Sequence, residues 1–173
     1  AREITAHRRW LAPWTSRRRA PQLVRCDEGA KLVVTRFLPG ELVLGHPSAH
    51  DPETYRQAGA LLAEFHAQEC AEDPDHEQRE NDRTLAWLDT SHRIAPEVAA
   101  EVRARIAGWP RVASTLVPTH GDWQPRNWLV HDGVVSVIDF GRAAMRPAAT
   151  DLARLAARDF ARDPELEHAF LDG

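Results

Sequence analysis

The sequence has few of the residues that crosslink a chain or hold zinc. Its 173 residues include only two cysteines, Cys26 and Cys70, which lie far apart and have no paired spacing. A disulfide framework and a cysteine-rich zinc site are therefore excluded. Such sparse cysteine is typical of proteins in a reducing compartment, so we expect a cytoplasmic location.

Long apolar runs and an excess of basic charge are also absent. No run approaches the roughly 18 apolar residues that a membrane-spanning helix needs, so we expect a soluble protein with no membrane partner. The formal net charge of −4 argues against binding nucleic acid, because neutralising phosphates requires a basic excess on one face. With 43% hydrophobic and 28% charged residues, the chain is composed like a globular domain with one core.

The residue pattern predicts an α+β fold. A short helix that ends before Pro13 is followed by two strands, between Leu23 and Phe37, that form a hairpin and end at Pro39-Gly40. From Asp51 the pattern is mostly helical, with Asp51 as the N-cap of the first long helix. We expect a solvated loop over the acidic segment 69–82, and helices near residues 85–88, over 96–107, from 150 and from 163.

A second hairpin is predicted between residues 128 and 138. Asp132-Gly133 separates two runs of β-forming residues, and this dipeptide favours a tight turn because both positions tolerate positive φ. Polar residues stand at the outer ends of the two strands, Asn127 before the first and Asp139 after the second. The hairpin should therefore bring Asn127 and Asp139 together.

These residues belong to a pattern that suits phosphoryl transfer. The chain reads His120-Gly121-Asp122 followed by Asn127, and then Asp139-Phe140-Gly141. This matches the H-x-D-x-x-x-x-N loop, strand pair and D-F-G of protein-kinase-like active sites. Such transfer needs a residue that orients the attacking hydroxyl, for which Asp122 is the candidate. It also needs hard oxygen ligands for Mg²⁺, which Asn127 and Asp139 can supply.

The segment 119–130, together with residues 137–141, resembles the aminoglycoside phosphotransferase and choline kinase family, in which glycine replaces the arginine of the protein-kinase loop. The resemblance extends upstream. Phe37-Leu38-Pro39-Gly40 resembles the hinge segment of the family, and residues 57–66 resemble its first large-lobe helix. The likeness thus covers nearly the whole chain.

The resemblance implies a protein-kinase-like fold, with a partial small lobe over residues 1–40 and a mostly helical large lobe over 41–173 that is truncated at its end. It implies that Asp122 is the catalytic base and that Asn127 and Asp139 hold Mg²⁺. The backbone near Phe37 and Leu38 would meet the adenine of ATP, or the base of GTP. Two further positions carry over from the family: Glu3 resembles the helix glutamate that pairs with the nucleotide-binding lysine, and Asp151 resembles a carboxylate that braces the catalytic loop.

Some recurring parts of such enzymes are missing from this chain. The only lysine, Lys31, follows Glu3, whereas the phosphate-gripping lysine should precede it, and no Gly-rich loop comes before it. The chain begins with Ala and stops soon after a helix begins, so we expect a fragment that is inactive by itself. No A-P-E signature follows Asp139, which favours a small-molecule acceptor over a protein.

The sequence therefore predicts a phosphotransferase that moves the γ-phosphate of ATP or GTP to a hydroxyl of a small molecule, such as an aminoglycoside or a metabolite. Two other functions stay open: a non-catalytic kinase-like binding module, and a metal-dependent phosphatase using His120, Asp122 and Asp139. The acidic segment 69–82 could attract a polycationic aminoglycoside, although a solvated loop is the more common role of such a run. The oligomeric state stays open.

Overall fold

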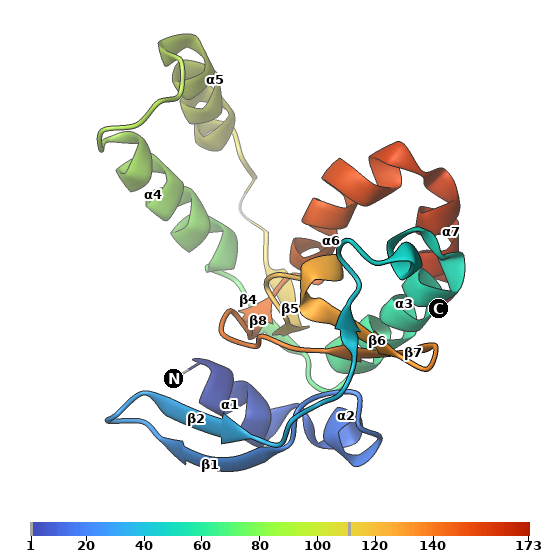
Figure 1. Ribbon diagram of the computed structural model, residues 1–173. Coiled ribbons are helices and arrows are strands. Elements are labelled where there is room, and N and C mark those ends of the chain that lie inside the picture. The colour runs from blue at the N-terminus through green and yellow to red at the C-terminus, as the bar shows by residue number, and fades with distance from the viewer. Residues whose placement is uncertain (1, 111) are drawn as a thin grey trace. The chain divides into compact units, whose positions relative to one another are not determined.

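The computed structural model describes residues 2–110 and 112–173, which form two compact units. The first unit combines the chain up to Cys70 with Val117–Gly173, and the second is Ala71–Leu116. Helices and small antiparallel sheets alternate along the chain, as Figure 1 shows. The α+β class predicted from the sequence is confirmed.

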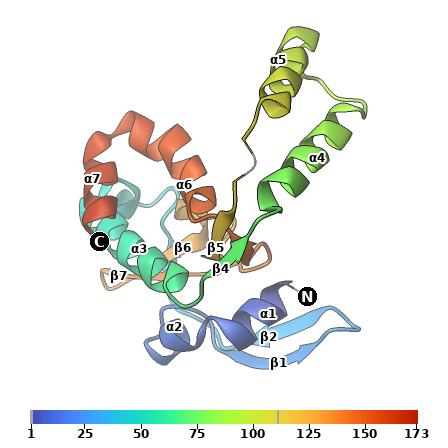
Figure 2. The same ribbon diagram turned by 180° about the vertical axis from the view of Figure 1, so that it is seen from behind.

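The first unit begins with two helices and a hairpin. Helix α1 (Arg2–Arg9) precedes α2 (Ala12–Ser16), and strands β1 (Leu23–Asp27) and β2 (Leu32–Thr35) pair antiparallel as predicted. Figure 2 shows α1 lying beside this hairpin, where Arg8 donates hydrogen bonds to Cys26 and Glu28. Helix α2 was not predicted. Pro13 lies in its first turn, where the missing N–H costs nothing.

Helix α3 (Pro52–His66) forms the centre of the first unit and packs on α7 (Pro164–Asp172). Its predicted N-cap is confirmed, because the Asp51 carboxylate accepts a hydrogen bond from the Glu53 N–H at 3.0 Å. The apolar side of α3 meets a cluster of fully buried aromatic side chains from several elements. These rings are Trp14, Tyr55, Phe65, Trp123, Trp128 and Phe140.

The predicted second hairpin forms two strands of a three-stranded sheet. Strand β3 (Glu41–Leu42) pairs with β6 (Trp128–His131), which pairs with β7 (Val134–Val137). Asp132 and Gly133 have φ of 49° and 74°, as a two-residue turn of this kind requires. Strand β3 was not predicted, because two residues are too few for a periodic pattern.

Two side chains from outside the sheet hold this hairpin in place. Gln57, on α3, accepts a hydrogen bond from the Val135 N–H at 3.0 Å and donates one to the Gly133 carbonyl at 2.8 Å. Arg19 donates to the Val135 carbonyl at 2.6 Å. The turn of the hairpin and the start of β7 are thus tied to α3 and to Arg19.

The remaining elements of the first unit surround the loop between β5 and β6. Residues Val117–Thr119 of β5 (Ser114–Thr119) pair with β8 (Ala144–Arg146). Helix α6 (Ala149–Leu155) follows and continues through a π-helical turn (Ala156–Phe160) towards α7. The two helices predicted here are confirmed. Short 3-10 turns also occur at Pro47–His50 and Pro125–Asn127.

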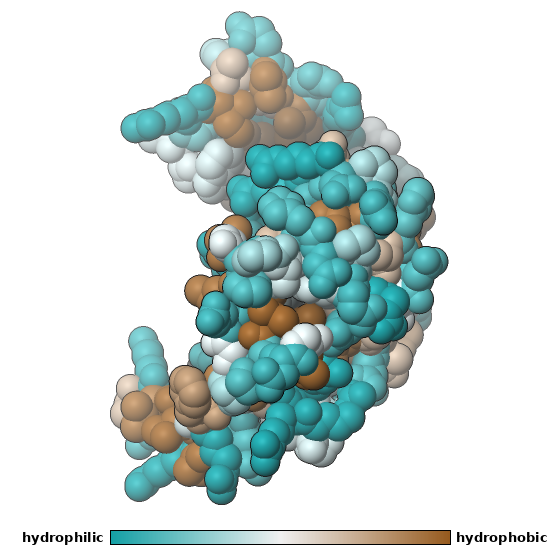
Figure 3. All heavy atoms as spheres, turned by 45° about the vertical axis from the view of Figure 1, so that its right-hand side comes forward, coloured by the Kyte–Doolittle hydropathy of each residue, from teal (hydrophilic) through white to brown (hydrophobic). Residues whose placement is uncertain are grey.

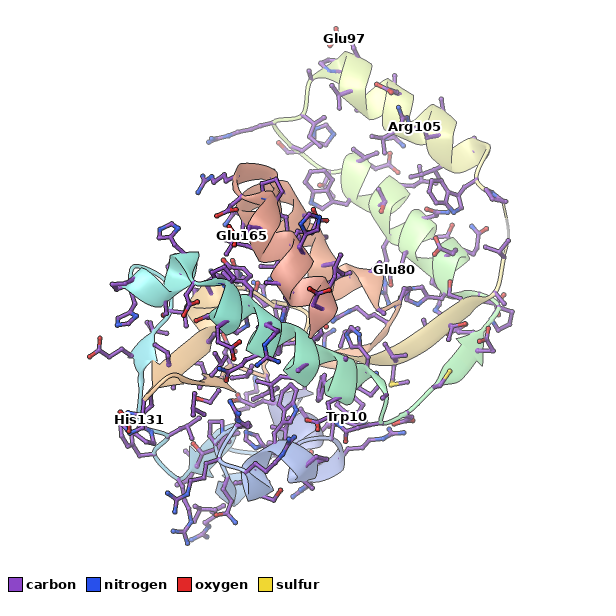
Figure 4. The ribbon with its side chains drawn as sticks, turned by 90° about the vertical axis from the view of Figure 1, so that its right-hand side faces the viewer. Trp10, Glu80, Glu97, Arg105, His131 and Glu165 are labelled. Carbon is purple, nitrogen blue, oxygen red and sulfur yellow. The ribbon has the colours of Figure 1, made fainter. Side chains whose placement is uncertain are left out.

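The second unit corrects the prediction for the acidic segment. Instead of a loop over 69–82, the chain forms β4 (Ala71–Asp73) and most of α4 (His76–Leu88), followed by α5 (Pro96–Ala107). Charged side chains pair locally along this segment: Arg83 pairs with Glu80 within α4, and Arg79 pairs with Asp73 at the end of β4. The pair within the helix stabilises it. Figure 4 labels two exposed charged residues of this unit, Glu80 on α4 and Arg105 on α5.

Apolar side chains reach the surface at the first hairpin. Val24, Leu32 and Val34 are between 41% and 60% exposed, and a brown patch marks this hairpin at the lower left of Figure 3. Among the described residues, β2 pairs only with β1, so its other edge is open. No helix in the described part of the chain is long and apolar enough to cross a membrane.

Candidate active site

The predicted catalytic residue Asp122 lies in the loop between β5 and β6 and is 2% exposed. Its Oδ1 accepts a hydrogen bond from Gln124 Nε2 at 2.6 Å, and Arg154 Nε lies 3.1 Å from the same oxygen. Its Oδ2 accepts from Asn127 Nδ2 at 3.2 Å and from Arg126. The carboxylate is therefore buried, but each of its oxygens has two partners.

The charge of Asp122 is stabilised by these partners. Burial alone would raise the pKa of the carboxyl. Hydrogen bonds from Arg126 and Asn127, with the charges of Arg126 and Arg154, outweigh burial and hold the pKa of Asp122 below its ordinary value. The side chain is thus an anion at neutral pH, the form that can accept a proton.

Asp151, at the start of α6, fixes the backbone of the loop between β5 and β6. Its carboxylate accepts hydrogen bonds from the backbone N–H groups of His120 at 2.9 Å and Gly121 at 2.6 Å, and His66 Nε2 lies 3.1 Å away. The side chain is 1% exposed. This geometry supports the bracing role that the family resemblance implied for Asp151.

Steric fit explains why position 121 of the loop is glycine. Gly121 has a φ of 79°, a conformation that other residues adopt with strain. A Cβ placed there would lie 2.5 Å from the Arg146 guanidinium and 2.6 Å from the Arg142 carbonyl oxygen. Arginine, which protein kinases have at this position of the loop, would not fit.

His120 supports the loop rather than serving as a base. Its ring is completely buried, and Nε2 lies 3.0 Å from the Ile138 carbonyl, to which it must donate. Burial lowers the pKa of His120 despite the nearby carboxylates. The neutral ring ties the loop before β6 to the end of β7.

Asn127 and Asp139 lie at adjacent ends of the hairpin, as predicted. The backbone N–H of Ile138 donates to the Asn127 carbonyl at 3.0 Å, so the next residue, Asp139, follows directly. Asp139 is exposed and has a φ of 64°, which turns the chain sharply. Its Oδ1 accepts only a weak hydrogen bond, from the Gly141 N–H at 3.3 Å.

This pair fits Mg²⁺. An accessible carboxylate and a carboxamide oxygen are the hard ligands that the ion prefers, and Mg²⁺ commonly takes one or two protein ligands with phosphate and water completing its shell. Among the described residues no group of three or more His, Cys, Asp or Glu side chains could hold a metal by itself.

Of the predicted nucleotide-binding residues, Glu3 lies on α1, and Phe37 and Leu38 follow β2. Burial, followed by the charge of Asp139, raises the pKa of Glu3. Phe37 is 89% exposed and Leu38 is half-buried. A cavity of about 510 Å³ adjoins both, and Asp122, Asn127 and Asp139 are not among its lining residues.

Sequence reasoning missed part of the site. Arg126 and Arg154 were not singled out, although an arginine one position before Asn127 and another three after Asp151 could have been noted. Trp123, next to Asp122 in the loop, is 1% exposed and packs on Trp14 in the core.

Comparisons with known proteins agree with this geometry. A family model described as "Phosphotransferase enzyme family" matches residues 2–173. No curated protein matches the chain.

Solved structures with the same fold span more residues than this chain. Macrolide 2'-phosphotransferase MphH from Brachybacterium faecium has 22% identity and a TM-score of 0.67, over 98% of this chain and 66% of that one. A choline/ethanolamine kinase family protein from Mesorhizobium loti has 21% identity and a TM-score of 0.67, over 99% and 60%. Aminoglycoside 2'-phosphotransferase-IIIa, solved as a GDP complex, has 15% identity and a TM-score of 0.63, over 95% and 64%.

At these identities the likeness to solved structures shows the fold, which is that of the protein-kinase-like phosphotransferases. The chain spans about two thirds of the length of the first of them. The family follows from the match over residues 2–173. The chain thus belongs to the phosphotransferase enzyme family.

Proposed function

We propose that the protein transfers the γ-phosphoryl group of ATP or GTP to a hydroxyl of a small molecule, such as an aminoglycoside or a hydroxylated metabolite. The observation that carries this proposal is the buried, anionic carboxylate of Asp122 beside Asn127, with Asp139 at the adjoining end of the hairpin. That is the arrangement a kinase-like transfer requires. We further propose a cytoplasmic location, in keeping with two free cysteines, Cys26 and Cys70.

In the proposed reaction, Asp122 accepts the proton of the acceptor hydroxyl while the hydroxyl oxygen bonds to the γ-phosphorus. The bond to the β-phosphate oxygen breaks, and the nucleoside diphosphate leaves with the electron pair of that bond. Mg²⁺, when bound by Asn127 and Asp139, neutralises charge on the phosphates. Asp151 and His120 keep Asp122 at the required position.

We propose that Phe37 and Leu38 belong to the hinge that meets the base and that Glu3 pairs with a nucleotide-binding lysine. Residues 1–40 would then belong to the small lobe and 41–173 to the large lobe. Lys31 lies at the turn of the first hairpin with a φ of 54°, and no described residue makes an ion pair with Glu3. The 173-residue chain alone should therefore bind Mg²⁺-ATP weakly and turn it over poorly, which calorimetry and an ADP-release assay would check.

The function is tested on the complete protein by ADP release from Mg²⁺-ATP and Mg²⁺-GTP with aminoglycosides, macrolides and choline as acceptors. Replacing Asp122 with Asn should leave nucleotide affinity near normal and lower turnover by about two to four orders of magnitude, the range for loss of a general base. Nucleotide binding without turnover for any acceptor would instead favour the non-catalytic module. Phosphate release without a nucleotide would favour the phosphatase.

Asp139→Ala tests the metal assignment separately. Because Asp139 is exposed and has few contacts, the variant should stay folded, losing only the small stability that alanine costs at a φ of 64°. It should lose Mg²⁺-dependent turnover. Exposed Asp132, seven residues earlier on the hairpin turn, gives the matched control Asp132→Ala. Turnover by Asp139→Ala equal to that of this control would exclude Asp139 as a metal ligand.

A further inference from the structure

Two arginines, Arg126 and Arg154, contact the carboxylate of Asp122 and lie between it and solvent. Arg126, in the catalytic loop, donates to Asp122 Oδ2, and Arg154, on α6, lies 3.1 Å from Oδ1. The arginine side chains are 47% and 41% exposed, whereas the Asp122 side chain is 2% exposed. Two positive charges therefore meet one buried negative charge, and the positive surplus faces solvent.

The surplus charge comes with unused hydrogen-bond donors. A guanidinium has five N–H donors in a planar fork. Among the described residues, Asp122 is the only carboxylate that contacts either arginine, and each arginine contacts it through a single nitrogen. The outward part of both forks is left to bind a carboxylate or phosphate, which arginine does bidentately.

The partners of Asp122 show why these arginines matter for the reaction. Both carboxylate oxygens are occupied, by Gln124 and Arg154 on one and by Asn127 and Arg126 on the other. An acceptor hydroxyl can reach Asp122 only if one partner moves. Gln124 and Asn127 are buried and fixed, at 6% and 5% exposure, so the half-exposed arginines are the groups that can turn away.

We propose that Arg126 and Arg154 bind an anionic group of the acceptor, a carboxylate or a phosphate, and that this binding releases an oxygen of Asp122 for the hydroxyl. The inference rests on the proposed function and narrows its acceptor to a hydroxylated anion. A polycationic aminoglycoside would be repelled by the same pair. With a cationic acceptor, Arg126 and Arg154 would thus stay on the Asp122 carboxylate, and the hydroxyl could not reach it.

The test measures binding of inorganic phosphate to the complete protein, without nucleotide or metal, by ³¹P NMR titration. Wild type should bind it, and Arg126→Gln and Arg154→Gln should each weaken binding tenfold or more. Arg158→Gln, an exposed arginine one turn beyond Arg154, is the matched control and should bind like the wild type. Asp122→Asn should bind phosphate more tightly, because it frees both guanidinium groups. Melting curves check that each variant is folded.

A second titration, with a non-hydrolysable ATP analogue and Mg²⁺ at saturation, separates the acceptor from the γ-phosphate. Phosphate that still binds beside the analogue supports an acceptor site, and phosphate displaced by it assigns the arginines to the nucleotide and overturns the proposal. Absence of phosphate binding to the wild type, or equal binding by all variants, also overturns it. Because no turnover is measured, phosphate binding by a protein that releases no ADP would refute the proposed function alone.

Discussion

Asp151 is the residue through which α6 controls the catalytic loop. It accepts two backbone hydrogen bonds, from His120 and Gly121, while being 1% exposed. Water cannot reach these buried N–H groups, so they would have no acceptor if the carboxylate were removed. Each unsatisfied N–H would lower the free energy of unfolding by about 1–3 kcal/mol. The position of Asp122, one residue further on, therefore depends on a carboxylate that does not itself touch the reacting groups.

We predict that Asp151→Asn lowers the free energy of unfolding by about 1–3 kcal/mol and reduces turnover while leaving the KM for nucleotide nearly unchanged. The amide can accept at one atom only, so one backbone N–H loses its partner. Asp132→Asn, at an exposed turn with φ of 49° where asparagine is tolerated, is the matched control. Urea unfolding and steady-state kinetics on both variants check this, and unchanged turnover by Asp151→Asn would refute the bracing role.

His120 should make stability depend on pH. Burial lowers its pKa in the folded state, so the unfolded chain binds a proton more readily, and protonation favours unfolding. The free energy of unfolding should therefore decrease as pH falls below about 6.5, the ordinary pKa of histidine, and stay constant above it. The same direction holds for His7, whose pKa is also lowered by burial.

Urea unfolding between pH 8 and pH 5 measures this dependence. His120→Gln, which keeps a donor for the Ile138 carbonyl, should reduce the slope by up to one proton, or about 1.4 kcal/mol per pH unit. Exposed His131, replaced in His131→Gln, provides the comparison. A slope unaffected by His120→Gln would mean that this ring does not titrate on unfolding.

At the scale of elements, the contact between α3 and α7 depends on one glycine. A Cβ on Gly59 would lie 1.9 Å from the Phe170 carbonyl oxygen, and backbone cannot move away as a side chain can. Helix α3 also carries Gln57, which holds the β6–β7 hairpin. A shift of this helix would therefore move the turn of the hairpin and the start of β7.

We predict that Gly59→Ala lowers the free energy of unfolding by about 1–3 kcal/mol, even though alanine favours helix formation, because overpacking outweighs propensity. Ala63→Met, on the exposed side of the same helix, should change it by less than about 0.5 kcal/mol. Thermal and urea unfolding compare the two variants. Stability of Gly59→Ala equal to or above that of the wild type would contradict the close packing of α3 on α7.

For the molecule as a whole, the first hairpin presents an open strand edge with apolar side chains. Val34, 41% exposed, lies on β2, which has one pairing partner among the described residues. Such edges promote association between chains. We predict that the 173-residue chain self-associates with rising concentration and that Val34→Thr reduces this tendency, since threonine keeps the β propensity and adds a polar group.

Sedimentation velocity at several concentrations measures the association. Val98→Thr, on α5 and 49% exposed, is the control for removing an exposed valine elsewhere. A monomer at every concentration, or an equal effect of the two variants, would exclude the hairpin edge as the contact.

The sequence by itself determined the parts of the protein that depend on local chemistry. The Asp132-Gly133 turn, the cap at Asp51 and the spacing from Asp122 to Asn127 are each specified by neighbouring residues, so the hairpin, α3 and the candidate site could be predicted. Strands β3 and β5 could not be predicted, because each pairs with strands far away in the sequence and has no local pattern that indicates this pairing. The helix of the acidic segment was missed because many charges in one segment are typical of a solvated loop. In the structure these charges form ion pairs with neighbouring arginines.

Only the tertiary structure decided how the site is charged. Arg154 lies 32 positions from Asp122 along the chain, and nothing in the spacing shows that α6 brings its guanidinium to within 3.1 Å of the carboxylate. The same holds for Gly121, which must be glycine because Arg142 and Arg146, about 20 residues later in the chain, lie against it. Electrostatics and steric fit depend on distances through space, which packing sets and sequence order does not.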